Sequence, residues 1–235
     1  MIKFDHLPLD KDILEALEEL HVNYVFQPIF EADGETVFAY EALMRPEEKS
    51  VLELIEEYTD LDKLHVLEVA SFFGSMQEYF SRGYEERVSI NSFPSDCLEA
   101  DEAEAFCACF GDDIRGRMIV ESLEYPYFSS EHWMKKSRSV KATDNLLSVD
   151  DFGSGINDLD RVDLMSPHMV KLDRDLISGI DHISEKQENV KNLVSEFHDR
   201  GIRVVAEGVE EKEEFDCLVD LGIDLYQGYY LARPA

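Results

Sequence analysis

The sequence predicts an α/β fold, a TIM-like (β/α)8 barrel with an irregular, antiparallel first strand. Three observations predict it. The chain has 235 residues, 44% of them hydrophobic, which suits one barrel with a sizeable core. Strand-like and helix-like segments alternate along most of its length. Several strand segments are short and apolar on both faces, as in a parallel sheet that helices cover.

The first elements differ from the rest. Residues 9–20 are expected to form a helix, because Asp10 can cap it and apolar residues recur on one face. Residues 22–30 and 36–44 have the pattern of strands, and the Asp-Gly turn at 32–34 joins them. So short a turn is typical of an antiparallel hairpin. The irregularity of the barrel is therefore expected at its first strand.

The remaining elements alternate regularly between strand and helix. The expected strands are 87–93, 118–123, 146–152, 168–172, 203–207 and 225–231. The expected helices are 50–58, 62–80, 95–110, 130–141, 184–200 and 211–221, with a short helix after the turn at Gly153. Together with the hairpin this makes eight strands, the number that closes a barrel of this class.

Polar residues recur near the carboxyl ends of the strands that follow the first. They are Glu41, Asn91, Glu121, Asp150, Asp151, Lys171, Glu207 and Gln227. Each one alone has an ordinary explanation, such as a helix cap or a solvated charge. In a barrel, however, these strand ends converge at one mouth, where functional residues lie. Their recurrence at seven successive strands favours one shared site.

These residue types predict a centre for two divalent cations, Mg²⁺ or Mn²⁺. Carboxylate and amide oxygens are the hard ligands that such ions prefer. The seven histidines include no H-x-x-x-H pair, so a zinc site is not expected. Two divalent ions together with Lys171 would balance the charge of the five carboxylates. Such a centre suits displacement at a phosphoryl group.

Composition excludes several classes of partner. The net charge of −30 argues against binding a nucleic-acid polymer or an anionic membrane. No apolar run approaches the ~18 residues of a membrane span, and the first residues lack the pattern of a signal peptide. The four cysteines form no C-x-x-C pair, as in a reducing compartment. We expect a cytoplasmic protein, or the cytoplasmic domain of a larger one.

Several motifs resemble, in order, those of the EAL-domain cyclic di-GMP phosphodiesterase family. They are Gln27-Pro28-Ile29, Glu41-Ala42-Leu43, Asn91, Glu121-Ser122-Leu123-Glu124, Asp150-Asp151-Phe152-Gly153, Lys171-Leu172-Asp173, Ala206-Glu207-Gly208-Val209-Glu210 and Gln227-Gly228-Tyr229. The tripeptide Glu41-Ala42-Leu43 alone is uninformative, because the same three residue types occur as Glu15-Ala16-Leu17 inside the first expected helix. The ordered set spans nearly the whole chain. The resemblance implies that residues 1–235 form a single EAL-type phosphodiesterase domain.

The resemblance also implies metal ligands and catalytic residues. The first ion would be held by Glu41, Asn91, Glu121 and Asp150. The second would be held by Asp150, Asp151 and Glu207. Catalysis would depend on Lys171, Glu41, Asp151 and Glu207, with Lys171 positioning the attacking water or helping to deprotonate it. Ca²⁺ is expected to inhibit, because its larger radius and looser geometry spoil the alignment.

Further residues are implied to contact or support the substrate. Arg45 would contact a phosphate, and Gln27 and Gln227 would lie near the ligand. Glu210 would support the site, although it also opens an acidic run at a helix start, where negative charge is favourable by itself. Glu124 would brace the loop at 152–158.

Two functions remain open on the sequence. The first is a phosphodiesterase that opens cyclic di-GMP to linear pGpG and so lowers second-messenger signalling. The second is a catalytically silent receptor for cyclic di-GMP, or a protein-interaction module, on the same fold. Retention of every expected ligand favours the enzyme over the receptor and over a barrel acting on another phosphodiester. The resemblance also implies a homodimer.

Overall fold

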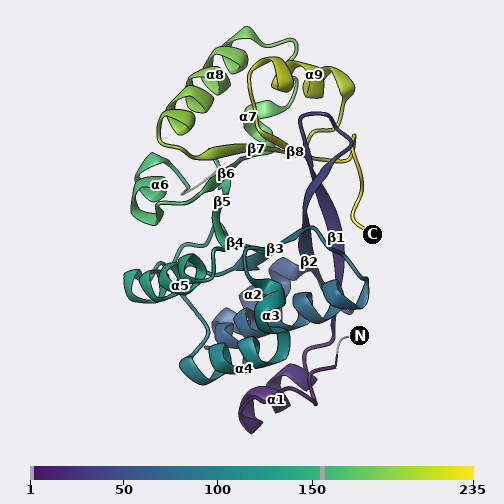
Figure 1. Cartoon of the computed structure of the whole chain (residues 1–235), viewed down its shortest axis with the longest axis vertical. Coiled ribbons are helices and arrows are strands. Elements are labelled where there is room, and N and C mark those ends of the chain that lie inside the picture. Colours follow the sequence, from purple (N-terminus) through teal and green to yellow (C-terminus); the bar gives the residue numbers. More distant parts are fainter. Residues whose placement is uncertain (1–2, 154–156) are drawn as a thin grey trace.

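The computed structural model describes residues 3–153 and 157–235 (Figure 1). In this described part, eight strands close into a barrel in the order β1 to β8, which confirms the expected fold class. Their bounds are β1 Val22–Glu31, β2 Val37–Pro46, β3 Arg87–Ser92, β4 Met118–Ser122, β5 Leu146–Phe152, β6 Met169–Leu172, β7 Arg203–Glu207 and β8 Leu225–Gln227.

The first strand is antiparallel to both of its neighbours, as expected. β1 pairs with β2 in a register that places Gln27 opposite Glu41, and it pairs with β8 at Phe30 and Glu31. The turn between β1 and β2 is shaped by Asp33, whose carboxylate accepts hydrogen bonds from the backbone N–H groups of the two residues before β2. The other neighbouring strands are parallel, so the carboxyl ends of β2 to β8 face the same way.

Helices lie outside the ring of strands, with α8 and α9 at the top of Figure 1 and α2, α3 and α4 at the bottom. Their bounds are α1 Lys11–Glu18, α2 Val51–Asp60, α3 Leu64–Ser81, α4 Ala100–Phe110, α5 Ser130–Ala142, α6 Leu159–Met165, α7 Arg174–Ile177, α8 Ser184–Asp199 and α9 Lys212–Asp220, with a 3-10 turn at Gly111–Ile114.

The structure corrects two expected boundaries and adds one short helix. α4 begins at Ala100 rather than at 95, because a capping box between Glu99 and Glu102 starts the helix there. β8 ends at Gln227 rather than at 231, because the chain then turns and Leu231 N donates a hydrogen bond back to Gly228 O. α7 was not expected. Its four residues begin at the cap formed by Asp173.

The core has two parts. The larger lies between the strands and the surrounding helices and includes Phe73, Val120 and Phe197. The smaller is an apolar layer inside the barrel, and its members are Ile29, Phe38, Ala39, Ile119, Met169, Val205 and Leu225. This inner layer is the floor on which the polar residues of the barrel mouth lie.

Candidate metal centre

Strand periodicity places the polar residues in one layer above the apolar floor. Side chains two positions apart on a strand share a face. Ala39 and Glu41 are such a pair, and so are Met169 and Lys171. The same spacing relates floor residues to Gln27, Glu121, Glu207 and Gln227. By this spacing, six strands contribute polar side chains to one layer, namely β1, β2, β4, β6, β7 and β8.

Glu41 differs from its expected position within its strand. It lies in the middle of β2 rather than near the end, because the β1–β2 hairpin continues to Pro46, past the mouth. Its carboxylate nevertheless reaches the centre of the cluster. It accepts hydrogen bonds from Asn91 Nδ2 at 3.1 Å and from Gln227 Nε2 at 2.5 Å.

Lys171 lies at the centre of the cluster and is 1% exposed. Its Nζ contacts carboxylate oxygens contributed by four strands. The distances are 3.3 Å to Glu41, 2.5 Å to Glu121, 3.1 Å to Asp150 and 3.0 Å to Glu207. One buried cation therefore faces four carboxylates, of which Glu207 is the most exposed.

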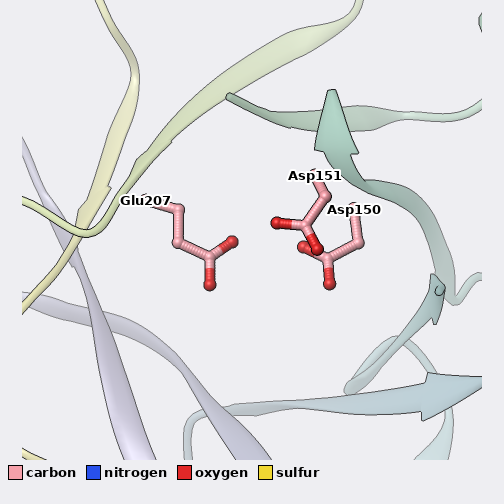
Figure 2. Close-up of side chains that lie close together, drawn as sticks. All are labelled: Asp150, Asp151 and Glu207. Carbon is pink, nitrogen blue, oxygen red and sulfur yellow. The ribbon is translucent and has the colours of Figure 1, made fainter. Parts of the chain in front are cut away.

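Three of the carboxylates lie close enough to hold a single metal ion. Oxygens of Asp150, Asp151 and Glu207 all lie within 4.8 Å of one another. Figure 2 shows the two aspartates side by side on one strand, with Glu207 opposite them. Adjacent residues of a regular strand point to opposite faces. Here the β5–β6 register shifts between Val149 and Phe152, and Asp151 has a positive φ of 47°, so both aspartates reach the mouth.

Burial first, and charge crowding after it, set the direction of the carboxylate pKa shifts. Burial, and after it the charge of Asp150, raises the pKa of Asp151 to about 7. Burial also raises the pKa values of Glu121 and Glu207 well above their ordinary range, against the effect of Lys171. Burial acts to lower the pKa of Lys171, but the surrounding carboxylates hold it well above its usual value. The cluster carries more negative charge than one lysine balances.

The residues present fit a divalent cation. The described carboxylate and amide oxygens form a hard donor set. Asn91 Oδ1 and Gln227 Oε1 are buried oxygens that accept no hydrogen bond from the described residues. Such oxygens are costly to bury unless something else satisfies them. A bound cation would satisfy Asn91 and relieve the repulsion among the carboxylates.

Two openings flank the cluster. One is a mainly apolar groove lined by Arg45, Leu52, Phe93 and Leu123 beside Glu41. Arg45 is exposed there, and its Nη1 donates a hydrogen bond to Met44 O at 3.0 Å. These side chains line a passage from the surface to the carboxylates.

The second opening lies on the other side of the cluster and is polar. Its lining includes Gln27, Asp151, Glu207, Glu210 and Gln227. Gln227 Nε2 lies 3.4 Å from Gln27 Oε1. Glu210 is exposed and forms an ion pair of 2.8 Å with Arg174, so its carboxylate points to that arginine. Both glutamines therefore adjoin the cluster, and Glu210 lies at its rim.

Glu124 lies near the aspartates, since its charge is among the causes that raise the pKa of Asp151. The loop at 152–158 that it is expected to brace includes residues 154–156, which lie outside the described residues. In the described part of this loop, Asn157 Nδ2 donates a hydrogen bond to Asp150 O at 2.6 Å. The loop is thus tied to the strand that carries the aspartates.

The sequence motifs do not identify the residues that support the site through hydrogen bonds and ion pairs without belonging to the predicted ligand set. Ser89 Oγ donates a hydrogen bond of 2.6 Å to Glu121 Oε2. Glu68 and Lys136 form a buried ion pair next to the end of β3. A signal for Glu68 is present in the sequence, because it is a charged residue within the otherwise apolar stretch 66–70.

Comparison with known proteins decides the family. The family model described as the EAL domain matches residues 10–234, nearly the whole chain. The chain belongs to the EAL domain family. The resemblance noted in the ordered motifs is thereby confirmed. A curated relative, the cyclic di-GMP phosphodiesterase TpdA of Vibrio parahaemolyticus, is 26% identical over 221 residues, covering 92% of this chain and 37% of TpdA.

Solved EAL structures have the same fold. A standalone versatile EAL protein from Vibrio cholerae O395, in its c-di-GMP bound form, matches with a TM-score of 0.81 and 27% identity, over 92% of this chain and 93% of that one. BlrP1 of Klebsiella pneumoniae, in a manganese/cy-diGMP complex, matches with a TM-score of 0.75 and 24% identity, over 92% of this chain and 56% of that one. EAL domains are therefore found with this dinucleotide and, in BlrP1, with manganese.

The chain spans 37% of TpdA, so TpdA has further regions outside the match. Of the helices in the described ranges, none is both long enough and apolar enough to cross a membrane.

Proposed function

We propose that this EAL domain is a metal-dependent phosphodiesterase that hydrolyses cyclic di-GMP to linear pGpG. The observation that carries the proposal is the cluster at the barrel mouth. Oxygens of Asp150, Asp151 and Glu207 lie within 4.8 Å of one another. Glu41, Glu121 and Asn91, whose Oδ1 is buried, complete a set of hard ligands around Lys171.

The ligand set supports a two-ion centre with Asp150 shared. Glu41, Asn91, Glu121 and Asp150 would hold one ion, and Asp150, Asp151 and Glu207 the other. Mg²⁺ and Mn²⁺ are the ions proposed. When bound, such a pair supplies Lewis acidity that activates water and stabilises charge in a phosphoryl displacement.

Lys171 is proposed as the catalytic cation of the chain itself. Its Nζ is anchored by four carboxylates at 2.5–3.3 Å, so it is held rigidly at the centre of the site. The three N–H donors of this ammonium all face carboxylates, so one would become free to orient a water molecule toward a phosphate when the carboxylates bind cations instead. Its neighbours Glu41, Asp151 and Glu207 are proposed to share the catalytic role through the ligands they provide.

The two openings suit a ligand with two phosphates and two bases. Arg45 at the apolar opening would pair with a phosphate, and the mainly apolar groove beside it suits a base. Gln27 and Gln227 at the polar opening offer amide donors and acceptors. Glu210 supports that rim through its ion pair with Arg174, and Glu124 the neighbouring loop.

A turnover assay tests the proposal. The protein is incubated with cyclic di-GMP and Mg²⁺ or Mn²⁺, and the products are separated by chromatography. We expect pGpG with either ion and none after chelation. Binding of cyclic di-GMP without any pGpG would instead identify a silent receptor on the same fold. Turnover of other phosphodiesters alone would contradict the proposed substrate.

The proposal extends to the setting of the enzyme. Residues 1–235 are proposed to act as one phosphodiesterase domain, in the cytoplasm and as a homodimer. Sedimentation of the purified chain tests the dimer independently of turnover.

A further inference from the structure

A buried ion pair lies outside the barrel, between α3 and α5. Glu68 of α3 is 0% exposed and Lys136 of α5 is 5% exposed. Lys136 Nζ lies 2.9 Å from Glu68 Oε1. Removing two charges from water costs several kcal/mol per ion, and only good geometry and additional hydrogen bonds repay that cost. The pair therefore needs an explanation other than packing.

The additional hydrogen bonds of the pair converge on the end of β3. Ser92 Oγ donates to Glu68 Oε1 at 2.8 Å, and Phe93 N donates to Glu68 Oε2 at 2.9 Å. Lys136 Nζ donates to Phe93 O at 2.6 Å and also to Ser92 Oγ. Both charged groups thus hold the same two consecutive residues.

The residue before these two is the candidate metal ligand Asn91. Its carbonyl oxygen accepts a hydrogen bond of 2.5 Å from Ser71 Oγ, which lies one turn along α3 from Glu68. On the opposite side, Asn91 Nδ2 donates to Glu41 Oε1 at 3.1 Å, and the buried Oδ1 accepts no hydrogen bond from the described residues. The backbone at 91–93 is therefore held from behind, while the Asn91 side chain faces the cluster.

We propose that Glu68 and Lys136, together with Ser71, are positioning residues that fix Asn91 and the end of β3 for the metal centre. The inference rests on the proposed metal-dependent function, and it adds residues that touch neither ion nor substrate. Groups that orient metal ligands from behind commonly change metal affinity about 10–100-fold when they are removed.

Stability and positioning can be separated in this pair. A buried ion pair replaced on both sides by apolar residues of similar volume is often as stable as before. The double variant Glu68→Met with Lys136→Leu should therefore fold, yet it removes every hydrogen bond from the pair to Ser92 and Phe93. A purely structural role predicts no change in metal binding by this variant.

The experiment measures Mn²⁺ binding directly, from the electron paramagnetic resonance signal of the free ion, with thermal unfolding recorded in parallel. Asn145→Leu is the matched control. Asn145 is 2% exposed, and its Oδ1 accepts a hydrogen bond of 3.0 Å from Met118 N, at the opposite end of the barrel. The control removes a buried polar anchor of a strand without touching the mouth.

We expect the double variant to bind Mn²⁺ about 10–100-fold more weakly than the unaltered chain, and Asn145→Leu to bind it as before. Ser71→Ala, which removes one hydrogen bond, should weaken binding several-fold and serves if the double variant fails to fold. A folded double variant, or Ser71→Ala in its place, that binds Mn²⁺ as tightly as the unaltered chain overturns the inference. No Mn²⁺ binding by the unaltered chain would overturn the metal centre itself.

Discussion

At the scale of single residues, Glu41 contacts three other residues of the site and so contributes to it in more than one way. Its two oxygens meet Asn91, Lys171 and Gln227. It contributes negative charge near Lys171 and accepts hydrogen bonds from two amides. Loss of this carboxylate should therefore disturb metal binding and the orientation of Lys171 together.

Glu41→Ala is expected to lower turnover of cyclic di-GMP by more than about 100-fold, because a direct ligand matters more than the groups that orient it. Rates of pGpG formation at saturating Mn²⁺ measure the effect. The chain offers a matched control in Glu15→Ala, within the same tripeptide sequence but on the surface of α1. Among the described residues, the Glu15 side chain forms only an exposed ion pair with Lys11. Normal turnover by Glu41→Ala would refute the ligand assignment.

His65, near the start of α3, makes a pH-dependent contribution to stability. Its ring nitrogens lie 3.0 Å from Asp96 and 2.9 Å from Glu102, and these hydrogen bonds, Asp96 first, raise the pKa of His65 to about 10 from 6.5. Because the pKa of His65 is higher in the folded state, its protonation stabilises the fold fully at pH values below the pKa of the unfolded state. This stabilisation is lost as the pH rises through the pKa of the folded state.

The variant His65→Gln should therefore be less stable than the unaltered chain by about 2 kcal/mol below pH 6.5, as long as both carboxylates stay ionised. The deficit should shrink above pH 6.5 and vanish near pH 10. Urea unfolding of both proteins across this range measures it. A deficit that stayed constant with pH would mean that the charge of His65 contributes nothing.

At the scale of elements, the exit from β8 constrains the site as much as the strands do. A Cβ atom on Gly228 would lie 2.0 Å from Val209 O and 2.3 Å from Val209 N. Val209 N donates a hydrogen bond to Gln227 O, and Tyr230 N donates one to Val209 O. Two chain segments cross here at a separation that only glycine permits, directly beside Gln227.

Gly228→Ala should cost about 3 kcal/mol of folding free energy or more, because backbone must move to admit the methyl group. Gly83→Ala is the control. Its Cβ meets nothing within 4 Å, so it should cost only about 1–2 kcal/mol for its positive φ. Chemical denaturation of the two variants compares them, and equal losses would exclude a steric role for Gly228.

At the scale of the whole molecule, the chain has a net charge of −30, and a few of its many carboxylates meet at the barrel mouth. Divalent ions that bind only the folded chain should stabilise it. At a Mn²⁺ concentration 100 times the dissociation constant, the gain is about 2.7 kcal/mol. Thermal unfolding with Mn²⁺, Mg²⁺ or chelator measures this gain in stability.

Ca²⁺ should also raise the melting temperature of the chain, but turnover of cyclic di-GMP should stay absent. Full turnover in Ca²⁺ would contradict the two-ion centre.

The sequence by itself determined the order of the strands and the identity of the residues at their ends. Both depend on local patterns. Apolar runs mark the buried strands, a two-residue repeat sets which side chains face inward, and an Asp-Gly turn marks the antiparallel hairpin. These patterns place Lys171, Glu207 and Gln227 near strand ends without reference to any tertiary contact.

Only the tertiary structure decided which of these residues meet. Glu41 and Gln227 are 186 positions apart and hydrogen-bond because the barrel closes. The shift that turns both Asp150 and Asp151 inward depends on pairing between β5 and β6. The hydrogen bonds of Glu68 and Lys136 to the end of β3 connect α3, α5 and β3, which no local sequence pattern relates. Periodic patterns of residues are present in the sequence itself and predict strands and their facing side chains. Contacts between distant segments, in contrast, form only when those segments pack together.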